Sequence, residues 1–483
     1  MTHSIAKDAT MLTLSKVLSI LINFFHVMIL SQQRNLKDFG TYSQIIIVVN
    51  LSLSIVLLGL PNSINYFIPR AESSNERNQF LNTYLSLGSL LTIIAGLLLL
   101  LLLPLITRFF TNKALANYSY VLVIFPLARF FTISQGNLLV ASRQTKRLVI
   151  YTIAISLTQL FHVLLVQWAD LTFSTYIALL VAIEVVFAFF SFYEFCRLNN
   201  RLRFYLKWSV LKPVLAFTVP IGVAYAVGTL NAEIDRAMIG YFLGTETLAI
   251  YSNASRELPI SIVGASITAV LMPVLVKLVK HKDIGKLLKL WNNAVELSYI
   301  SAICFSVPLM VFAPQFISLA YGAKYLPGSE VFRIYILVML WRFTYFGIIL
   351  NVSGNSKMIL YSSVASLLLN VVLNYLCFLL FGMVGPAIAT FISLGVMQLF
   401  QLWYSSKILN ASFFKVFPWK SLLNLTLIGA IFTVFGLYVV SSLQLTHGMD
   451  DYLIMALSSI IWLIVYYLAF RHRINRLRGG MSI

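Results

Sequence analysis

Charged residues are scarce in this sequence. Only 11% of its 483 residues are Asp, Glu, Lys or Arg, whereas a soluble globular protein carries about 25%. Hydrophobic residues make up 59% of the chain, and its mean hydropathy is +0.87. This composition excludes a protein built from soluble domains. It indicates an all-α polytopic membrane protein, because long apolar runs cross a bilayer as helices.

Cysteines and catalytic motifs are also nearly absent. Cys196, Cys304 and Cys377 are far apart in the sequence, so they predict neither a metal site nor a disulfide framework. The chain has no Walker-type phosphate loop, no HExxH and no GxSxG, and its six histidines are scattered. We therefore expect no cofactor, no ATP hydrolysis and no covalent catalysis.

Fourteen apolar segments are long enough to cross a membrane. A hydrocarbon core of about 30 Å requires about 20 helical residues. Pro220 is expected to interrupt the seventh segment, because a proline inside a helix removes a backbone hydrogen bond. The predicted spans are 11–32, 40–60, 80–104, 117–142, 147–168, 171–196, 212–242, 246–277, 290–314, 327–352, 356–380, 385–407, 419–442 and 452–470.

Basic residues outnumber acidic ones by 35 to 16, which gives a net charge of +19. In a soluble protein this excess would favour nucleic acid as a partner. Here 25 of the 35 fall in connections on one side of the predicted membrane and five on the other. The positive-inside rule therefore places both termini in the cytoplasm, and we expect no nucleic-acid partner. The other five are arginines inside predicted spans: Arg129, Arg236, Arg256, Arg333 and Arg342.

Short patterns recur along the chain at a nearly constant offset. Thr-Tyr-Ser at 41–43 and Ile-Tyr-Ser at 250–252 are 209 residues apart, and Ser142 and Ser353 are 211 apart. This regularity predicts a duplicated six-span unit, and two pseudo-symmetric lobes in the same orientation. The predicted parts are an N-lobe at 1–196, a basic cytoplasmic linker at 197–211, a C-lobe at 212–407, and spans 13 and 14 with a basic cytoplasmic tail at 408–483.

One membrane segment, from Asn231 to Pro273, is unusually rich in charge. Two predicted spans meet there at a short turn, and a charge at the bilayer centre costs at least about 2.5–3.5 kcal/mol. We expect a water-filled, charged cavity. The alternative is that Asp235–Arg256 or Arg236–Glu257 pairs lock two helices together. The charged residues near the turn are Glu233, Asp235, Arg236, Arg256 and Glu257.

Four stretches carry motifs of a known family. They are Phe-Gly-x-Tyr and Gly-Leu-Pro within 29–69, DRAMIGYFLGTETLAIYSNASRELP at 235–259, Tyr-Gly-x-x-Tyr within 317–334, and Asn-x-x-x-Asn followed by Gly-x-x-Gly-x-Ala-x-Ala-Thr within 353–393. In order and spacing they resemble the polysaccharide repeat-unit flippases. These are bacterial O-antigen and capsule translocases of the multidrug/oligosaccharidyl-lipid/polysaccharide exporter superfamily.

The resemblance implies a transporter that flips an undecaprenyl-pyrophosphate-linked oligosaccharide from the cytoplasmic to the periplasmic leaflet of the bacterial inner membrane. Arginines in a cavity would replace water around the pyrophosphate, because arginine stays charged and binds phosphate oxygens in pairs. Arg256 matches a cavity arginine of lipid II flippases, but span 2 lacks the basic residues found there and offers Asn50 instead. The candidate substrate-binding residues are Arg129, Arg236, Arg256, Arg342 and Asn50.

Asp235, Glu257 and Glu184 are the candidates for ion coupling. Each of them could instead balance an arginine, and Glu184 could form a structural pair with Arg129. The implied partners are the lipid-linked oligosaccharide, membrane lipids, and a polysaccharide polymerase with its chain-length machinery. Two alternatives remain open. They are an ion-coupled exporter of cationic drugs like the multidrug transporters of the superfamily, which predicts an acidic cavity, and a lipid II-type flippase. A polymerase or ligase would need a long external loop, and none is predicted.

Overall fold

The computed structural model describes residues 2–199, 203–258, 261–443 and 449–481. Within these ranges the regular elements are α-helices (α) and short 3₁₀-helices (η), with no strand. The predicted all-α polytopic fold is confirmed. Eleven described helical segments are long and apolar enough to cross a membrane, and one of them, Ser356–Ile408, covers two predicted spans. The count of fourteen crossings stays a prediction.

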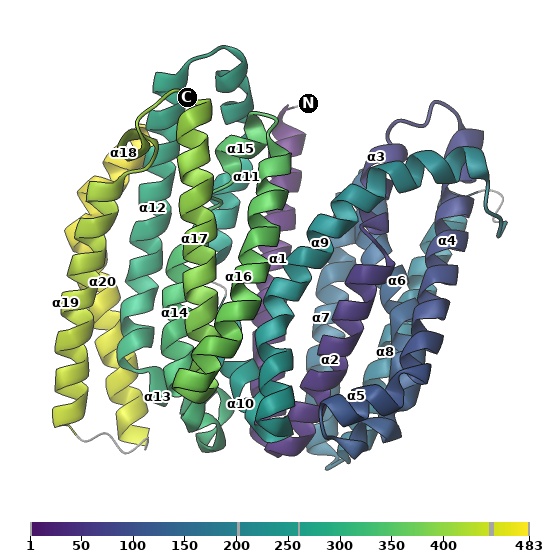
Figure 1. The fold of residues 1–483 in the computed structure, drawn as a ribbon, viewed down its shortest axis with the longest axis horizontal. Helices are drawn as coiled ribbons and strands as arrows, with labels where there is room; N and C mark the ends of the chain where they lie inside the picture. Colours follow the sequence, from purple (N-terminus) through teal and green to yellow (C-terminus); the bar gives the residue numbers. More distant parts are fainter. Residues whose placement is uncertain (1, 200–202, 259–260, 444–448, 482–483) are drawn as a thin grey trace. The chain divides into compact units, whose positions relative to one another are not determined.

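The helices form two compact units that meet in sequence between Ala249 and Ile250. The first unit, coloured purple to teal in Figure 1, contains α1 (Thr2–Gln33), α2 (Leu36–Val56), α3 (Leu60–Phe67), α4 (Ser74–Leu101), α5 (Leu103–Phe109), η1 (Lys113–Tyr118), α6 (Ser119–Ala141), α7 (Thr145–Trp168), α8 (Phe173–Leu198), α9 (Trp208–Phe242) and the start of α10 (Gly244–Ala254).

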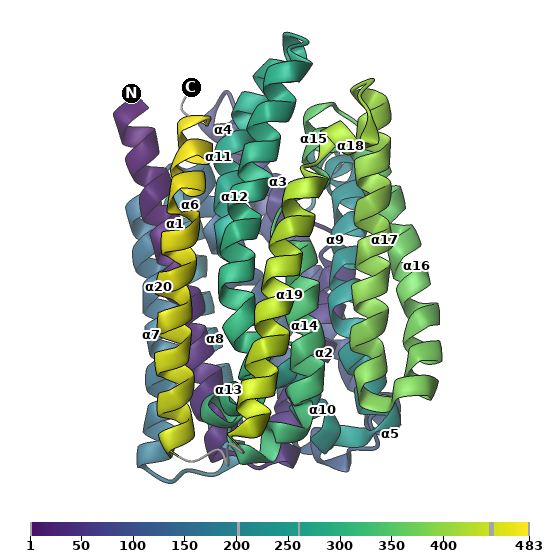
Figure 2. The same cartoon turned by 90° about the vertical axis from the view of Figure 1, so that its left-hand side faces the viewer.

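The second unit contains the end of α10 and the helices that follow, coloured teal to yellow in Figure 2. These are α11 (Ser261–Lys280), α12 (Ile284–Val311), α13 (Ala313–Tyr321), η2 (Ala323–Gly328), α14 (Ser329–Arg342), α15 (Ile348–Val352), α16 (Ser356–Phe381), η3 (Gly382–Val384), α17 (Gly385–Ile408), α18 (Phe413–Val416), α19 (Trp419–Ser442) and α20 (Met449–Gly479).

Each unit has its own pattern of helix packing. In the first, α1 packs along α7, α6 packs on both α4 and α8, and α9 packs on α2 and α3. In the second, α16 and α17 form a hairpin, and α12 packs against α11, α14, α19 and α20. Helix α9, the first helix of the predicted C-lobe, thus belongs to the first compact unit. The lobe boundaries predicted from the repeat stay predictions.

The order of the elements repeats at a constant offset. A short helix that begins with a proline in its first turn, a 3₁₀-helix and a long helix follow one another in both units. α5 and α13 begin at Leu103 and Ala313, η1 and η2 at Lys113 and Ala323, and α6 and α14 at Ser119 and Ser329, each 210 residues apart. This offset lies between the 209 and 211 residues of the short sequence patterns, which supports an internal duplication.

Helix α9 is continuous from Trp208 to Phe242, so the expected interruption at Pro220 is wrong. It bends along its length instead, as Figure 1 shows, because a proline can remove one hydrogen bond without ending a helix that is packed on its neighbours. Close to the proline, Gly222 packs directly on the break between α2 and α3, where Leu58 and Gly59 have φ values of 41° and 70°.

Replacing Gly222 by alanine is expected to destabilise the packing of α9. A Cβ at this position would lie 2.1 Å from the carbonyl carbon of Leu58. This is a backbone atom, so a change of side-chain rotamer cannot relieve the clash. Overpacking of this kind costs about 1–3 kcal/mol. Thermal unfolding of the purified protein in detergent should show a lower Tm for Gly222→Ala. Gly228→Ala in the same helix is the control, because no atom lies within 4 Å of its added Cβ.

The motifs that carry the family resemblance have structural roles in these helices. In the Phe-Gly-x-Tyr motif, a Cβ on Gly40 would lie 2.1 Å from the backbone oxygen of Thr245, so only glycine allows α2 to approach α10 this closely. In the α16–α17 hairpin, the Asn370 amide donates to Thr390 Oγ1 at 3.1 Å, and Asn374 donates to Asn370 Oδ1 at 3.2 Å. Buried polar pairs of this kind hold helices together inside a membrane.

Candidate functional site

A polar cluster in the first unit joins α2 to α9. Asn50 Nδ2 donates to Glu233 Oε1 at 3.2 Å, and Arg236 Nη1 lies 3.3 Å from Glu233 Oε2. Glu233 and Arg236 share one face of α9 because they are three residues apart. Asp235, one residue before Arg236, is 1% exposed. The Glu233 carboxylate therefore contacts two candidate substrate-binding residues, Asn50 and Arg236.

Glu233 is the site residue that the sequence analysis did not assign a role. Its position among the charges near the turn was visible in the sequence, and its spacing of three residues from Arg236 predicts an ion pair on a helix. The contact with Asn50 could not be found in this way, because the two residues are 183 positions apart in the chain.

A second charged pair in the first unit joins α6 to α8. Arg129 Nη2 lies 3.1 Å from Glu184 Oε1, and the arginine also stacks over the Phe125 ring at 5.0 Å. The Glu184 side chain is 0% exposed, whereas that of Arg129 is 34% exposed. A carboxylate removed from solvent requires a partner, which Arg129 supplies. The structural pair considered from the sequence is therefore present, and the role of Glu184 in ion coupling stays a prediction.

In the second unit, predicted span 8 is not a single helix. Across 246–277, α10 ends at Ala254 and α11 begins at Ser261, and Arg256 lies in the interruption. Pro259, which the sequence placed near this arginine, lies outside the described residues. An interrupted helix leaves backbone groups without intrahelical partners, and transporters place binding sites at such breaks. Arg256 is therefore located where a ligand could contact both a side chain and the backbone.

Predicted span 10 is interrupted as well. Across 327–352, α14 ends at Arg342 and α15 begins at Ile348. The backbone of α11 packs directly on this break, because a Cβ added to Gly264 would lie 1.8 Å from the Phe343 carbonyl oxygen. Spans 8 and 10 are thus each divided into two helices, and tertiary packing rather than apolar composition decides where these helices end.

The two interruptions are joined by an ion pair. Arg342 Nη1 contacts Glu257 Oε1, so the last residue of α14 is tied to the residue after Arg256. The Glu257 side chain is 57% exposed and that of Arg342 is 29% exposed. An exposed carboxylate can exchange its partner at low cost because water replaces the lost contact. This pair thus differs from Arg129–Glu184, in which the carboxylate is fully buried.

The structure thus places the eight predicted site residues in three groups. Arg236 pairs with Glu233 and Glu257 pairs with Arg342, contacts that the sequence analysis did not propose. Within the described residues, no group of His, Cys, Asp and Glu is arranged to hold a metal ion. The groups are Asn50, Asp235 and Arg236 near the α2–α9 contact, Arg129 and Glu184 between α6 and α8, and Arg256, Glu257 and Arg342 at the interrupted helices.

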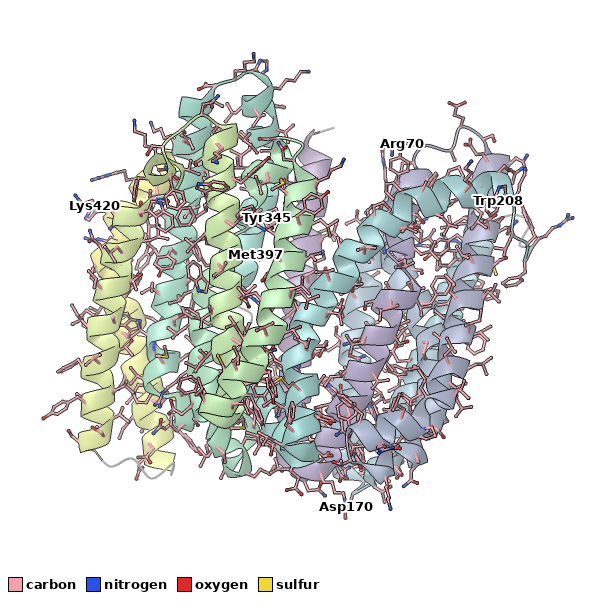
Figure 3. The ribbon with its side chains drawn as sticks, in the orientation of Figure 1. Arg70, Asp170, Trp208, Tyr345, Met397 and Lys420 are labelled. Atoms are coloured by element: carbon pink, nitrogen blue, oxygen red, sulfur yellow. The ribbon has the colours of Figure 1, made fainter. Side chains whose placement is uncertain are left out.

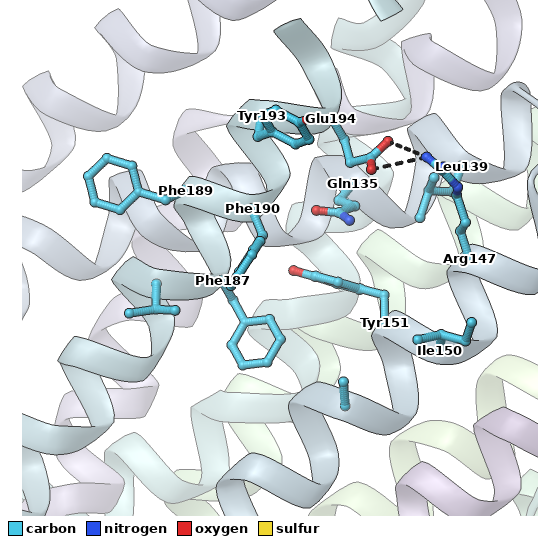
Figure 4. Close-up of a pocket in the computed structure, with 12 residues that line it drawn as sticks. Gln135, Leu139, Arg147, Ile150, Tyr151, Phe187, Phe189, Phe190, Tyr193 and Glu194 are labelled. Atoms are coloured by element: carbon cyan, nitrogen blue, oxygen red, sulfur yellow. Dashed lines mark hydrogen bonds and ion pairs between the residues drawn. The ribbon is translucent and has the colours of Figure 1, made fainter. Parts of the chain in front are cut away.

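A separate cavity of about 890 Å³ lies beside α6, α7 and α8. Figure 4 shows the aromatic side chains that line it, among them Tyr151, Phe187 and Phe190. Its charged groups are Arg147 and Glu194, whose Nη1 and Oε2 atoms are 3.1 Å apart. None of the candidate arginines lines this cavity, and its walls are mainly apolar. It is therefore not the anion site expected from the sequence.

Comparisons with known proteins bear on the family of this chain. A family model described as polysaccharide biosynthesis protein matches residues 35–330. The uncharacterized membrane protein MJ1068 of Methanocaldococcus jannaschii is 22% identical over 409 residues, which cover 78% of this chain and 79% of that protein. The probable low-salt glycan biosynthesis flippase Agl15 of Haloferax volcanii is 23% identical over 225 residues, 45% of this chain and 47% of that protein.

The fold also matches a solved structure. The lipid II flippase MurJ, in an inward closed conformation, superposes with a TM-score of 0.74. The superposition covers 95% of this chain and 99% of that chain at 18% sequence identity. At this level of identity the match establishes a shared fold. It agrees with the all-α architecture.

Proposed function

This chain belongs to the polysaccharide biosynthesis protein family, and we propose that it is a flippase for undecaprenyl-pyrophosphate-linked oligosaccharide repeat units, O-antigen or capsular. It would carry them from the cytoplasmic to the periplasmic leaflet of the inner membrane by alternating access, with both termini in the cytoplasm. A polysaccharide polymerase and its chain-length machinery would take up the product. Support comes from the family match and from a relative that is named a glycan biosynthesis flippase.

The observation that carries this proposal is the position of Arg256 and Arg342 at helix interruptions in otherwise apolar segments. A pyrophosphate cannot enter hydrocarbon bare, because an unpaired buried charge has a prohibitive desolvation cost. Guanidinium groups can replace its water, since each binds two phosphate oxygens at once. Backbone N–H groups at a broken helix add further donors for the same anion.

The Arg342–Glu257 pair supplies a way to exchange the anion. Glu257 neutralises Arg342 in the structure. An arriving pyrophosphate would displace this exposed carboxylate, and Glu257 would then be available to bind a proton or another cation. This exchange links substrate binding to an ion without leaving an arginine unpaired in the membrane. Asp235 and Glu184 are the other candidates for coupling, and both are buried.

Within the first unit, Arg236, Asn50 and Arg129 are further candidate contacts for a phosphate or a sugar. Arg236 and Asn50 both contact Glu233, so a phosphate or sugar hydroxyl that approaches them competes for the same carboxylate. Arg129 would use the exposed part of its guanidinium, because its other side is held by Glu184. The amide of Asn50 suits a sugar, since it offers both a donor and an acceptor.

The test is a reconstituted flipping assay. Proteoliposomes would contain the purified protein and a lipid-linked oligosaccharide, and a membrane-impermeant glycosidase would report how much sugar is exposed on the outer surface. We expect the protected half of the sugar to become accessible only in vesicles that contain the protein. Empty vesicles are the control, and equal protection with and without protein would refute the proposal.

Two other substrates in the same assay decide between the alternatives. Transport of lipid II at the same rate as the oligosaccharide would indicate a lipid II-type flippase. Uptake of a cationic dye without any movement of lipid-linked sugar would indicate a drug exporter. We expect neither, because span 2 contains no basic residue and the family match is to polysaccharide biosynthesis proteins.

A further inference from the structure

The second unit contains a basic pocket at the junction of α18, α19, α12 and α20. Its volume is about 540 Å³, and Figure 3 shows Lys420 at the end of α19 that adjoins α18. This pocket has no part in the site described above. The residues that line it are Asn292, Phe414, Lys415, Phe417, Pro418, Trp419, Lys420, Ser421, Asn424 and Arg473.

The lining of this pocket carries three cations and no carboxylate. Arg473 is already engaged, because its Nε lies 2.5 Å from Glu296 Oε1 and its Nη2 lies 2.5 Å from Ser421 Oγ. Lys415 and Lys420 are both exposed at the pocket. Even with Glu296 counted, positive charge is in excess here. The pocket therefore favours an anion.

Local contacts hold the pocket in shape. Asn292 of α12 donates to the backbone oxygen of Lys415 at 3.1 Å, and the Trp419 indole N–H donates to the backbone oxygen of Phe413 at 3.2 Å. The Arg473–Glu296 pair joins α20 to α12. Because three helices and the α18 turn are tied together, an anion would meet a largely preformed site and would lose little affinity to ordering.

The surroundings of the pocket favour a lipid over a soluble anion. It lies at the basic ends of α19 and α20, which the positive-inside rule assigns to the cytoplasm. Trp419, which lines the pocket together with the exposed Phe414, is a residue type enriched at the membrane–water boundary. From there an exposed apolar stripe continues along one face of α19 at intervals of four residues, through Leu423, Leu427 and Ile431.

We propose that this pocket binds the headgroup of an anionic phospholipid of the adjoining leaflet. Lys415 and Lys420 would contact the phosphate, Ser421 and Asn424 would contact the glycerol, and an acyl chain would lie along the apolar stripe of α19. The bound lipid fixes the packing of α19 and α20 on α12, because a ligand that binds only the folded state stabilises it. This inference is independent of the substrate that the protein transports.

The experiment compares lipid retention by charge variants. The full-length protein would be purified in detergent, supplied with equal amounts of phosphatidylglycerol and phosphatidylcholine, and examined by native mass spectrometry and thermal unfolding. We expect the wild type to retain phosphatidylglycerol preferentially and to gain Tm from it. Lys415→Gln/Lys420→Gln should bind it about 30-fold more weakly, as expected for the loss of two cations near an anionic group.

A matched control variant loses the same amount of positive charge at a different place on the protein. Lys146→Gln/Lys212→Gln removes two exposed lysines of the first unit, on the predicted cytoplasmic side, and should bind the lipid like the wild type. Arg473 is left unchanged in both variants, because its removal would leave Glu296 without this partner. Equal retention of phosphatidylglycerol by wild type and pocket variant would overturn the proposal. So would an equal gain in Tm from glycerol 3-phosphate, since the pocket would then bind a soluble anion.

Discussion

Arg129→Ala is expected to lower the stability of the first unit by about 3–5 kcal/mol, because it leaves the fully buried Glu184 carboxylate without this partner. The variant should show a marked loss of Tm in detergent and a reduced yield of folded protein. The size of the effect follows from burial, since water cannot replace the lost guanidinium around a side chain with no exposed surface.

A double variant separates the effect of the lost charge from the effect of the lost packing. Arg129→Ala/Glu184→Gln removes both charges and should recover most of the lost stability, because no carboxylate is left buried beside the missing guanidinium. Arg147→Ala serves as the surface control. Its ion pair with Glu194 has the same 3.1 Å length but a more exposed arginine, so the loss should be only about 0.2–1 kcal/mol. Equal losses for Arg129→Ala and Arg147→Ala would show that Glu184 does not depend on its partner.

Arg256→Ala and Arg342→Ala are each expected to abolish export of surface polysaccharide while leaving the amount of protein in the membrane normal. Both arginines lie at helix interruptions, and under the proposed function they replace the water of a pyrophosphate. The measurement is complementation of a strain that lacks the gene, with immunoblots of the polysaccharide and of the tagged protein. Arg342→Lys should restore export only in part, because an ammonium cannot form the bidentate contact.

Arg333→Ala provides the matched control for these variants. This arginine lies on the same helix as Arg342, but it pairs with Glu330 in the first turn of α14 and is not at an interruption. Its loss should leave export unchanged. Full complementation by both Arg256→Ala and Arg342→Ala would refute the assignment of these arginines as contacts of the pyrophosphate. The flipping assay would still decide whether the protein moves lipid-linked sugar.

Several features of the fold could be predicted from the sequence because they are local. Each of the fourteen predicted spans has a helix or a pair of helices in the structure, since apolar runs with few charges form helices in a membrane. The duplication could also be predicted, because an offset of 209–211 residues between short patterns becomes an offset of 210 between whole elements. The candidate arginines were found for the same reason, as rare charges inside apolar segments.

Tertiary packing alone determined the partners of these charges and the ends of the helices. Glu184 could equally have faced a cavity, and only the approach of α6 to α8 pairs it with Arg129. Helix α14 ends at Arg342, where the backbone of α11 packs against Phe343, whereas α9 continues through Pro220 and packs on α2 and α3. These outcomes depend on contacts between residues far apart in the chain, and composition and periodicity describe only residues that are near one another.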